Sequence, residues 1–423
     1  MKTTSLLFLL ILLPQVLPAL TLEQIQQKAL AARPVIRQYQ VAVEQSGEDL
    51  RLARSGYYPS VNLGYKAWGL DEATSREARE NSSFYGALRW NLFSGLKDQY
   101  SIVAAEMINE VEELRLESIK QDIQLAIALK YLAVYNQAAL LDVAEDTSKT
   151  LKKLYLESRN RQEVGLLDKN TVLKFKVDYD NADLEVRREK ANLQKAINDL
   201  SREANLPLVF SDLEFEEFDQ VPGLFDPDSA EQKMLADRSD LRILEKMVAA
   251  AQAKSKVRKA GYYPQLNFST TYSAYDNHYL SGQGRVNEDE LRAELSLSVN
   301  LFNGYADEAA ISKAEAEVRS VNFQLAELQN NYKTELKNLF VDYEINRANI
   351  AITREDIAYA EENLRITEIK YKEGLQRQLD LLAAIANLTR AQANYVSVIR
   401  LVFTNYFQII RMVEDVPQTE QQE

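Results

Sequence analysis

Apolar and polar residues alternate along four stretches of the chain, at residues 60–68, 83–92, 265–275 and 291–301. In the last stretch an apolar residue occupies every second position from Leu291 to Leu301. Because the side chains of a β-strand point alternately to opposite faces, this pattern predicts strands with one apolar and one polar face. We expect two hairpins, within residues 60–92 and 265–301.

Helical spacing dominates the rest of the chain. It predicts short helices before each hairpin, with a break at Arg33-Pro34, and a long helical stretch after each, at residues 96–203 and 305–411. Each long stretch holds one interior glycine, Gly165 or Gly374. Since glycine inside a helix costs about 1 kcal/mol relative to alanine, we expect each glycine to mark a turn between two antiparallel helices. Apolar residues recur at alternating intervals of three and four along these helices, which is typical of coiled-coil packing.

Two short motifs occur twice, about two hundred residues apart. Gly56-Tyr57-Tyr58-Pro59 matches Gly261-Tyr262-Tyr263-Pro264, and Asn91-Leu92-Phe93-Ser94-Gly95 matches Asn300-Leu301-Phe302-Asn303-Gly304. The chain is therefore predicted to contain two internal repeats built on one plan. We place the first repeat at residues 20–206, a linker at 207–228, the second repeat at 229–412 and a polar tail at 413–423.

The first nineteen residues resemble a signal peptide. Lys2 precedes an apolar run, and Ala19 is a small residue suited to cleavage. The run is too short for a membrane-spanning helix, which needs about twenty apolar residues. We therefore assign residues 1–19 to a signal peptide and expect the mature protein to be exported.

Composition narrows the function further. The net charge is −13, which disfavours nucleic acid as a partner, because binding to phosphates requires basic residues. The chain has no cysteine and a single histidine, His278, so it offers no thiolate metal site and no disulfide. It carries no phosphate-binding loop, metal cluster or nucleophile motif. We expect no cofactor and no enzyme activity; an acid pair such as Asp180 and Asp183 fits a solvated helix face better than an active site.

Strands of about ten residues have the length of outer-membrane strands. Their apolar sides would face outer-membrane lipid, and Lys66, Arg89, Arg292 and Glu294 would face the lumen of a barrel. Because an open sheet edge is not viable in lipid, four strands must join those of other copies. Two copies would give a filled barrel, and three would leave a passage. A soluble sheet, in a periplasmic coiled-coil scaffold or adaptor that does not span the membrane, is the alternative.

The order and spacing of these features resembles the outer-membrane efflux protein family, the TolC-like channels, over about residues 20–412. The resemblance is carried by Thr21-Leu22, Arg33-Pro34, the two repeated motifs and the two glycine turns. It implies a mainly α-helical fold with a membrane part: long antiparallel helices forming an α-barrel, plus four strands per chain in a twelve-stranded β-barrel shared by a homotrimer. It implies the outer membrane of a Gram-negative bacterium, with the helices extending into the periplasm.

The same resemblance implies a function and its partners. The protein would be a passive conduit of a tripartite efflux or type I secretion system, exporting small molecules or proteins. Its partners would be a periplasmic adaptor (membrane fusion) protein and an inner-membrane transporter of the RND, MFS or ABC class. The helix tips that contact the adaptor would include Gly165, Leu166, Gly374 and Leu375.

The resemblance also implies a pore gate at Asp380, with Tyr371 in the network that closes it. Some members of the family carry a second acid three residues later, where this chain has Ala383, and the equivalent of Asp380 in the first repeat is Thr171, so only one ring of acids is expected. Three such carboxylates around a threefold axis would repel one another and attract cations. The alternative role of Asp380 is a helix N-cap or a first-turn acid that stabilises the start of the last helix.

Overall fold

The computed structural model describes residues 20–75, 77–223, 226–280 and 289–414. The expected signal peptide and most of the polar tail lie outside these ranges. The first half of the chain forms α1 (Leu22–Ala32), α2 (Pro34–Ser55), β1 (Ser60–Gly69), β2 (Glu80–Phe93), α3 (Lys97–Glu163), α4 (Lys169–Ala204), η1 (Phe210–Asp212) and η2 (Glu216–Phe218). The second half forms α5 (Pro227–Asp237), α6 (Ser239–Lys259), η3 (Ala260–Tyr262), β3 (Gln265–Asp276), β4 (Asp289–Ser298), α7 (Ala306–Lys372) and α8 (Gln378–Val413).

Helices and strands lie where the periodicity predicts them, with two differences. β4 ends at Ser298, so Leu301, expected inside the strand, lies beyond it with 91% of its surface exposed. Residues 229–260, expected to be helical, form two helices separated at Arg238. The side chain of Arg238 is buried, stacks on the ring of Tyr332 at 3.9 Å and bonds the carboxylate of Asp240 at 3.1 Å. The break between α5 and α6 is held by a buried ion pair, which the periodicity of hydrophobic residues does not predict.

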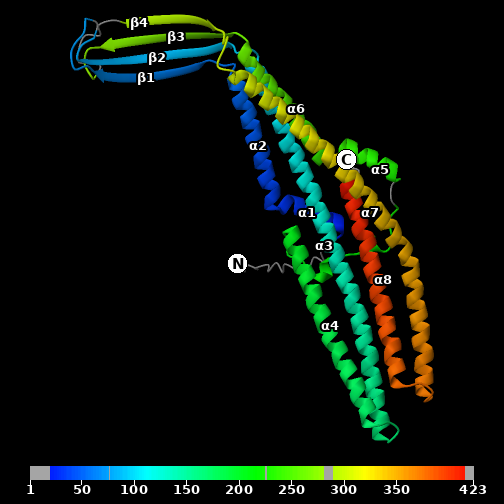
Figure 1. Cartoon of the computed structure of the whole chain (residues 1–423). Helices are drawn as coiled ribbons and strands as arrows, with labels where there is room; N and C mark the ends of the chain where they lie inside the picture. The colour runs from blue at the N-terminus through cyan, green and yellow to red at the C-terminus, as the bar shows by residue number, and fades with distance from the viewer. Residues whose placement is uncertain (1–19, 76, 224–225, 281–288, 415–423) are drawn as a thin grey trace, which may run out of the picture. The chain divides into compact units, whose positions relative to one another are not determined.

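The chain divides into two compact units, and α3 and α7 contribute residues to both. One unit comprises residues 35–119 and 235–333 and contains a single antiparallel sheet in the order β1-β2-β3-β4 (Figure 1). The two hairpins are joined through β2 and β3, where Leu88 pairs with Thr270. β1 and β4 therefore form the two edges of the sheet.

The repeated Asn-Leu-Phe motif builds the corner between strand and helix in this unit. The amide of Asn91 donates to the carboxylate of Asp98 at 2.6 Å, and the hydroxyl of Ser94 donates to the same oxygen at 2.6 Å. In the second half, the amide of Asn300 donates to Asp307 at 2.7 Å. Each aspartate also lies beside the glycine of the other repeated motif: a Cβ at Gly56 would come within 3.1 Å of the Asp98 carboxylate. The two motifs thus meet at one carboxylate in each half.

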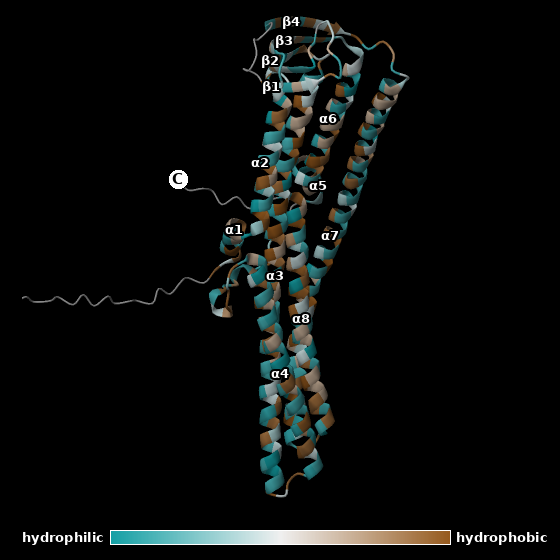
Figure 2. Ribbon diagram, turned by 90° about the vertical axis from the view of Figure 1, so that its left-hand side faces the viewer, coloured by the Kyte–Doolittle hydropathy of each residue, from teal (hydrophilic) through white to brown (hydrophobic). Residues whose placement is uncertain are grey.

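The other unit comprises the described residues of 20–34, 120–234 and 334–414 and is helical. α3 and α7 have 67 residues each, and α4 and α8 have 36 each. Hydrophobic and hydrophilic residues are interspersed along the whole length of these helices (Figure 2). The core near the two glycine turns holds Phe175 and Leu381, which are 0% and 1% exposed.

Residues 207–223, the main part of the expected linker, pack against this helical unit through their aromatic side chains. Phe218 is buried, and its ring centroid lies 4.9 Å from that of Phe403 on α8. Phe215 contacts Tyr131 of α3 with ring centroids 4.8 Å apart. The prolines and acids of this segment suggest a loop, but its aromatic residues bury enough apolar surface to fix it against the helices.

Among the described residues, only α8 is long and apolar enough to cross a membrane by length and composition. Twelve of its residues, including Val402, Phe403 and Ile409, are buried within the chain. A core helix passes the same test as a membrane span, and the burial of these side chains accounts for the apolar sequence of α8.

Candidate functional site

The apolar faces of the four strands lie on the same side of the sheet. Directly opposed residues of an antiparallel pair lie on the same face, so the pairings Leu63 with Gly86, Gly86 with Tyr272, and Tyr272 with Leu291 form one row across the sheet. Residues of this face are exposed despite being apolar: Leu63 and Leu291 are each 74% exposed, and Leu297 is 69% exposed. A continuous exposed apolar face of this kind marks an interaction surface, here one for lipid or protein.

The opposite face carries the charged residues predicted to line a lumen: Lys66, Arg89, Arg292 and Glu294. Arg89 and Glu294 each pair with Ser269, so the two charges share one row, with Ser269 between them. The guanidinium of Arg292 bonds Glu290 on the same strand at 2.7 Å. The sheet thus brings all four predicted residues to one polar face.

Glycine at position 64 shapes this polar face. A Cβ at Gly64 would come within 2.5 Å of the ring and hydroxyl of Tyr85, the residue opposite it on β2. The tyrosine ring therefore occupies the space that a side chain at position 64 would fill. Neither the glycine nor the tyrosine stands out in the alternation of apolar and polar residues, and only their pairing reveals the arrangement.

Exposed aromatic residues gather where the strands meet the helices, a feature that sequence reasoning missed. Six of them are at least half exposed: Tyr57, Tyr58, Tyr262, Tyr263, Phe302 and Tyr305. The indole of Trp90 donates a hydrogen bond to the backbone of Tyr57 at 3.0 Å, which ties the first group to β2. The repeated Tyr-Tyr-Pro sequence contains four of these aromatic residues, but sequence periodicity indicates only that it marks a boundary between helix and strand.

Both predicted glycine turns are present, and their hydrogen bonds are the same. The N–H of Gly165 bonds the carbonyl of Gln162, and that of Leu166 bonds Arg161, at 3.0 and 2.9 Å. Gly374 and Leu375 make the corresponding bonds at 3.1 and 2.9 Å. This pattern closes a helix with a left-handed residue, and φ is +78° at Gly165 and +79° at Gly374. Both leucines are 74% exposed, so each turn presents an apolar tip.

The helices that follow the turns begin differently. Asp168 caps α4: its carboxylate accepts from the backbone and the hydroxyl of Thr171, at 2.9 and 2.7 Å. These bonds from Thr171 lower the pKa of Asp168. At the start of α8 the geometry is reversed, because Asp380 lies in the first turn and accepts from the backbone N–H of Arg377 at 3.1 Å. Asp380 therefore stabilises a helix start, as its alternative role predicts; its role as a gate stays a prediction.

Tyr371, the other predicted gate residue, is half-buried and packs against Phe175 with ring centroids 6.1 Å apart. Burial raises the pKa of its hydroxyl. The side chain of Gln378, at the start of α8, donates to the carbonyl of Thr171 on α4 at 3.1 Å. The structure thus brings the two helical hairpins together close to their turns, with Tyr371 in the contact.

A model of the outer membrane efflux protein family matches residues 25–205 and, a second time, residues 231–412. The chain belongs to this family. Membership identifies it as a TolC-like channel protein of the outer membrane of a Gram-negative bacterium. Proteins of this family are channels and not enzymes. Asp180 and Asp183, the acid pair considered above, form ion pairs along α4 with Lys176 and Arg187.

Relatives and solved structures agree with the family assignment. Protein CyaE of Bordetella pertussis is 23% identical over 387 residues, covering 87% of this chain and 77% of the relative. Outer membrane protein TolC of Escherichia coli is 20% identical over 393 residues, covering 88% of this chain and 77% of TolC. A membrane protein from Pseudomonas aeruginosa has the same fold, with a TM-score of 0.82 at 16% identity over 93% of this chain and 92% of its own. The structure of CusC also has this fold, with a TM-score of 0.81 at 15% identity over 93% of this chain and 91% of its own.

Proposed function

We propose that three copies of this chain close a twelve-stranded β-barrel in the outer membrane and continue as a tunnel of twelve long helices in the periplasm. The observation that carries the proposal is the four-stranded sheet, which has an exposed apolar face and two open edges. Unpaired backbone groups cost several kcal/mol each in lipid, so β1 and β4 need partners. Pairing β1 of one copy with β4 of the next satisfies both edges and continues the apolar face around a barrel.

The two halves of the chain support this closure. The family model matches each half separately, and each half supplies two strands, one helix of 67 residues and one of 36. Two similar halves in each of three copies give six near-equivalent units around one axis. The exposed aromatic residues at the ends of the strands suit the interface between membrane and water, where such side chains are enriched.

In this arrangement the protein is a passive conduit for the export of small molecules or proteins, in a tripartite efflux or type I secretion system. The exposed turns at Gly165-Leu166 and Gly374-Leu375 are the proposed contacts for a periplasmic adaptor protein. An inner-membrane transporter of the RND, MFS or ABC class supplies the energy. Lys66, Arg89, Arg292 and Glu294 line the lumen of the barrel.

Disulfide crosslinking tests the closure, because the natural chain has no cysteine. Asn62→Cys on β1 is combined in turn with Glu290→Cys, Arg292→Cys, Glu294→Cys or Ser296→Cys on β4. Two strands lie between β1 and β4 in one chain, which separates them by about 14 Å. That distance is too long for an intramolecular disulfide, so a bond reports contact between copies.

We expect one or two of these combinations to give covalent trimers in non-reducing electrophoresis, and single-cysteine variants to give none. Monomers in every combination would refute the shared barrel. Covalent dimers that never extend to trimers would replace it with a two-copy barrel. Conductance of the purified protein in planar bilayers provides an independent check that the assembly encloses a passage.

A matched pair of substitutions separates the two roles of Asp380. Asp380→Asn keeps an acceptor for the backbone N–H of Arg377 but removes the charge, whereas Asp380→Ala removes both. A gate made of three carboxylates predicts that both variants lose cation preference or block by divalent cations in single-channel recordings. If only Asp380→Ala changes the recordings, Asp380 acts as a helix-start residue and the gate is refuted.

A further inference from the structure

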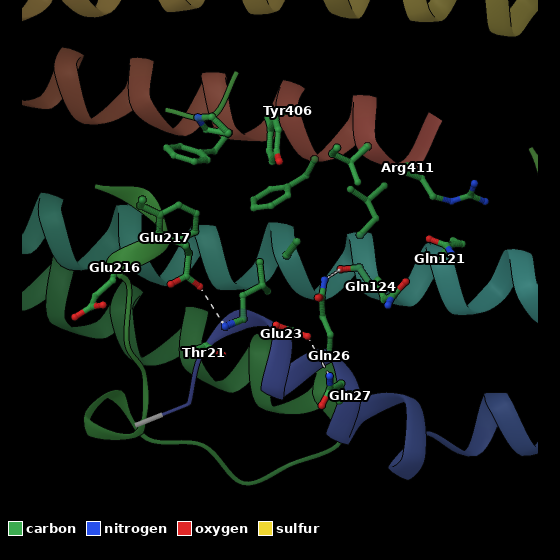
Figure 3. Close-up of a pocket in the computed structure, with 18 of the residues that line it drawn as sticks. Thr21, Glu23, Gln26, Gln27, Gln121, Gln124, Glu216, Glu217, Tyr406 and Arg411 are labelled. Atoms are coloured by element: carbon green, nitrogen blue, oxygen red, sulfur yellow. Dashed lines mark hydrogen bonds between the residues drawn. The ribbon is translucent and has the colours of Figure 1, made fainter. Parts of the chain in front are cut away.

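A cavity of about 1200 Å³ lies inside the helical unit, between α1, α3, η2 and α8 (Figure 3). It is distant in sequence from the glycine turns, and no strand residue lines it. Its volume exceeds that of a typical pocket for a small organic molecule, which is roughly 300–1,000 Å³. The conduit proposed above assigns no role to this cavity.

One wall of the cavity is aromatic. Phe218 of η2 and Phe403, Tyr406 and Phe407 of α8 contribute to the lining. Their rings form a chain of contacts: Phe218 to Phe403 at 4.9 Å, Phe403 to Phe407 at 6.3 Å, and Tyr406 to Phe407 at 5.6 Å between centroids. This packing fixes the rings in place, so the wall is already formed without a ligand.

Another part of the lining is acidic. Glu23 of α1 and Glu216 and Glu217 of η2 line the cavity, and Figure 3 shows them on the side where α1 lies, with α8 on the other side. Glu217 accepts a hydrogen bond from the backbone of Leu22 at 3.1 Å, which holds it in position. The side chain of Glu216, in contrast, makes no hydrogen bond or ion pair with any described residue, and Glu216 is exposed.

The lining carries little positive charge to offset these acids. Its one described cation is Arg411, whose guanidinium bonds Asp122 and Glu414, each at 2.8 Å. The pKa of the neighbouring Tyr131 is raised by burial and then by the charge of Glu217. That direction agrees with a negative potential on this side of the cavity.

We propose that this cavity binds an organic cation that carries an aromatic ring system. The flat rings of such a molecule would pack on Tyr406 and Phe407, which keep exposed ring surface, and its positive charge would lie near Glu216 and Glu217. A cation over an aromatic face is stabilised by the ring quadrupole, and the nearby carboxylates add a Coulombic attraction. Neutral aromatic molecules would gain only the contacts with the aromatic side chains, and anions would be repelled by the glutamates.

Fluorescence anisotropy of ethidium with the purified, assembled protein in detergent tests the proposal. We expect saturable binding that weakens as salt is raised, because part of the attraction is between exposed charges. Glu216→Gln should weaken binding about three- to tenfold, since it removes one carboxylate in a partly screened setting. Phe407→Ala should weaken it about fivefold through the lost ring contact. Glu361→Gln is the matched control, because Glu361 is an exposed carboxylate of α7 outside the cavity.

The outcomes separate clearly. Ethidium binding that is unchanged in both Glu216→Gln and Phe407→Ala, or equally weakened in Glu361→Gln, would overturn the proposal. Equal affinity for the anionic dye fluorescein would also overturn it, because the acidic wall would then have no effect. Unaltered circular dichroism of Glu216→Gln excludes loss of fold as the cause of weaker binding. Crosslinking between β1 and β4 tests trimer closure separately, so either proposal can fail alone.

Discussion

The corner between strand and helix gives the sharpest quantitative prediction. Asp98 accepts two side-chain hydrogen bonds, from Asn91 and Ser94, whereas Asp307 accepts one, from Asn300. Removing a hydrogen bond to a charged group costs about 1.5–3 kcal/mol when the site is buried, and less when it is half-buried as here. We therefore expect Asp98→Ala to lower the free energy of unfolding of the sheet by about 2–4 kcal/mol, and Asp307→Ala by about 1–2 kcal/mol.

Tryptophan fluorescence offers a local assay for this difference. The two tryptophans of the chain, Trp68 and Trp90, lie on β1 and β2, so their emission reports on the sheet. With a urea dependence of about 2 kcal/mol per molar, Asp98→Ala should move the unfolding midpoint down by about 1–2 M. Protein concentration is held constant across the variants, because association of copies adds to apparent stability.

The control for this experiment is Asp49→Ala, which removes an exposed carboxylate of α2 with no described hydrogen bond or ion pair. Its effect should stay within about 0.5 kcal/mol. A midpoint shift for Asp98→Ala no larger than that for Asp49→Ala would refute the stabilising role of the Asp98 carboxylate. A larger loss of stability for Asp307→Ala than for Asp98→Ala would also refute it, because the number of accepted hydrogen bonds would then not determine which substitution costs more.

Three further predictions follow from single positions. Leu297→Arg, on the apolar face, should reduce oligomer recovered from outer membranes through a penalty of about 2–4 kcal/mol, whereas Ser296→Arg on the polar face should not. Gly374→Ala should lower thermal stability by about 1 kcal/mol because φ is +79°, while Gly223→Ala, without positive φ, should have little effect. Because the folded pKa of Asp168 lies below its unfolded value of 3.8, the Asp168 carboxylate stabilises the start of α4 at pH values above 3.8. This stabilisation is lost as pH falls from 3.8 through the folded pKa, so hydrogen-exchange protection factors at the start of α4 should fall over that range.

Local periodicity was sufficient to locate the strands, the long helices and the two glycine turns. The reason is that period two and period 3.6 depend only on which side chains share a face of one element. The positive φ at Gly165 and Gly374 likewise follows from the low cost of that conformation for glycine alone. The exposed apolar faces of the strands also follow from their alternation, once the strands are aligned.

Specific side-chain contacts, both local and long-range, were decided by the tertiary structure. Nothing in the alternating pattern indicates that Asn91 and Asn300 each bond an aspartate seven residues later, although both aspartates are visible in the sequence. The packing of Phe218, in the expected linker, depends on aromatic partners such as Phe403, which lies far along the chain. The sequence allowed two roles for Asp380, a gate or a residue that stabilises a helix start. The structure shows that its carboxylate accepts a hydrogen bond from the backbone N–H of Arg377.

The sequence by itself therefore determined the elements of this protein and the face that each turns outward. Only the tertiary structure decided the order of strands in the sheet, the carboxylates at its corners and the cavity between α1, η2 and α8. The physical reason is that a face is set by the spacing of neighbouring residues. A pairing or a cavity is set by which distant surfaces fit together with their polar groups satisfied.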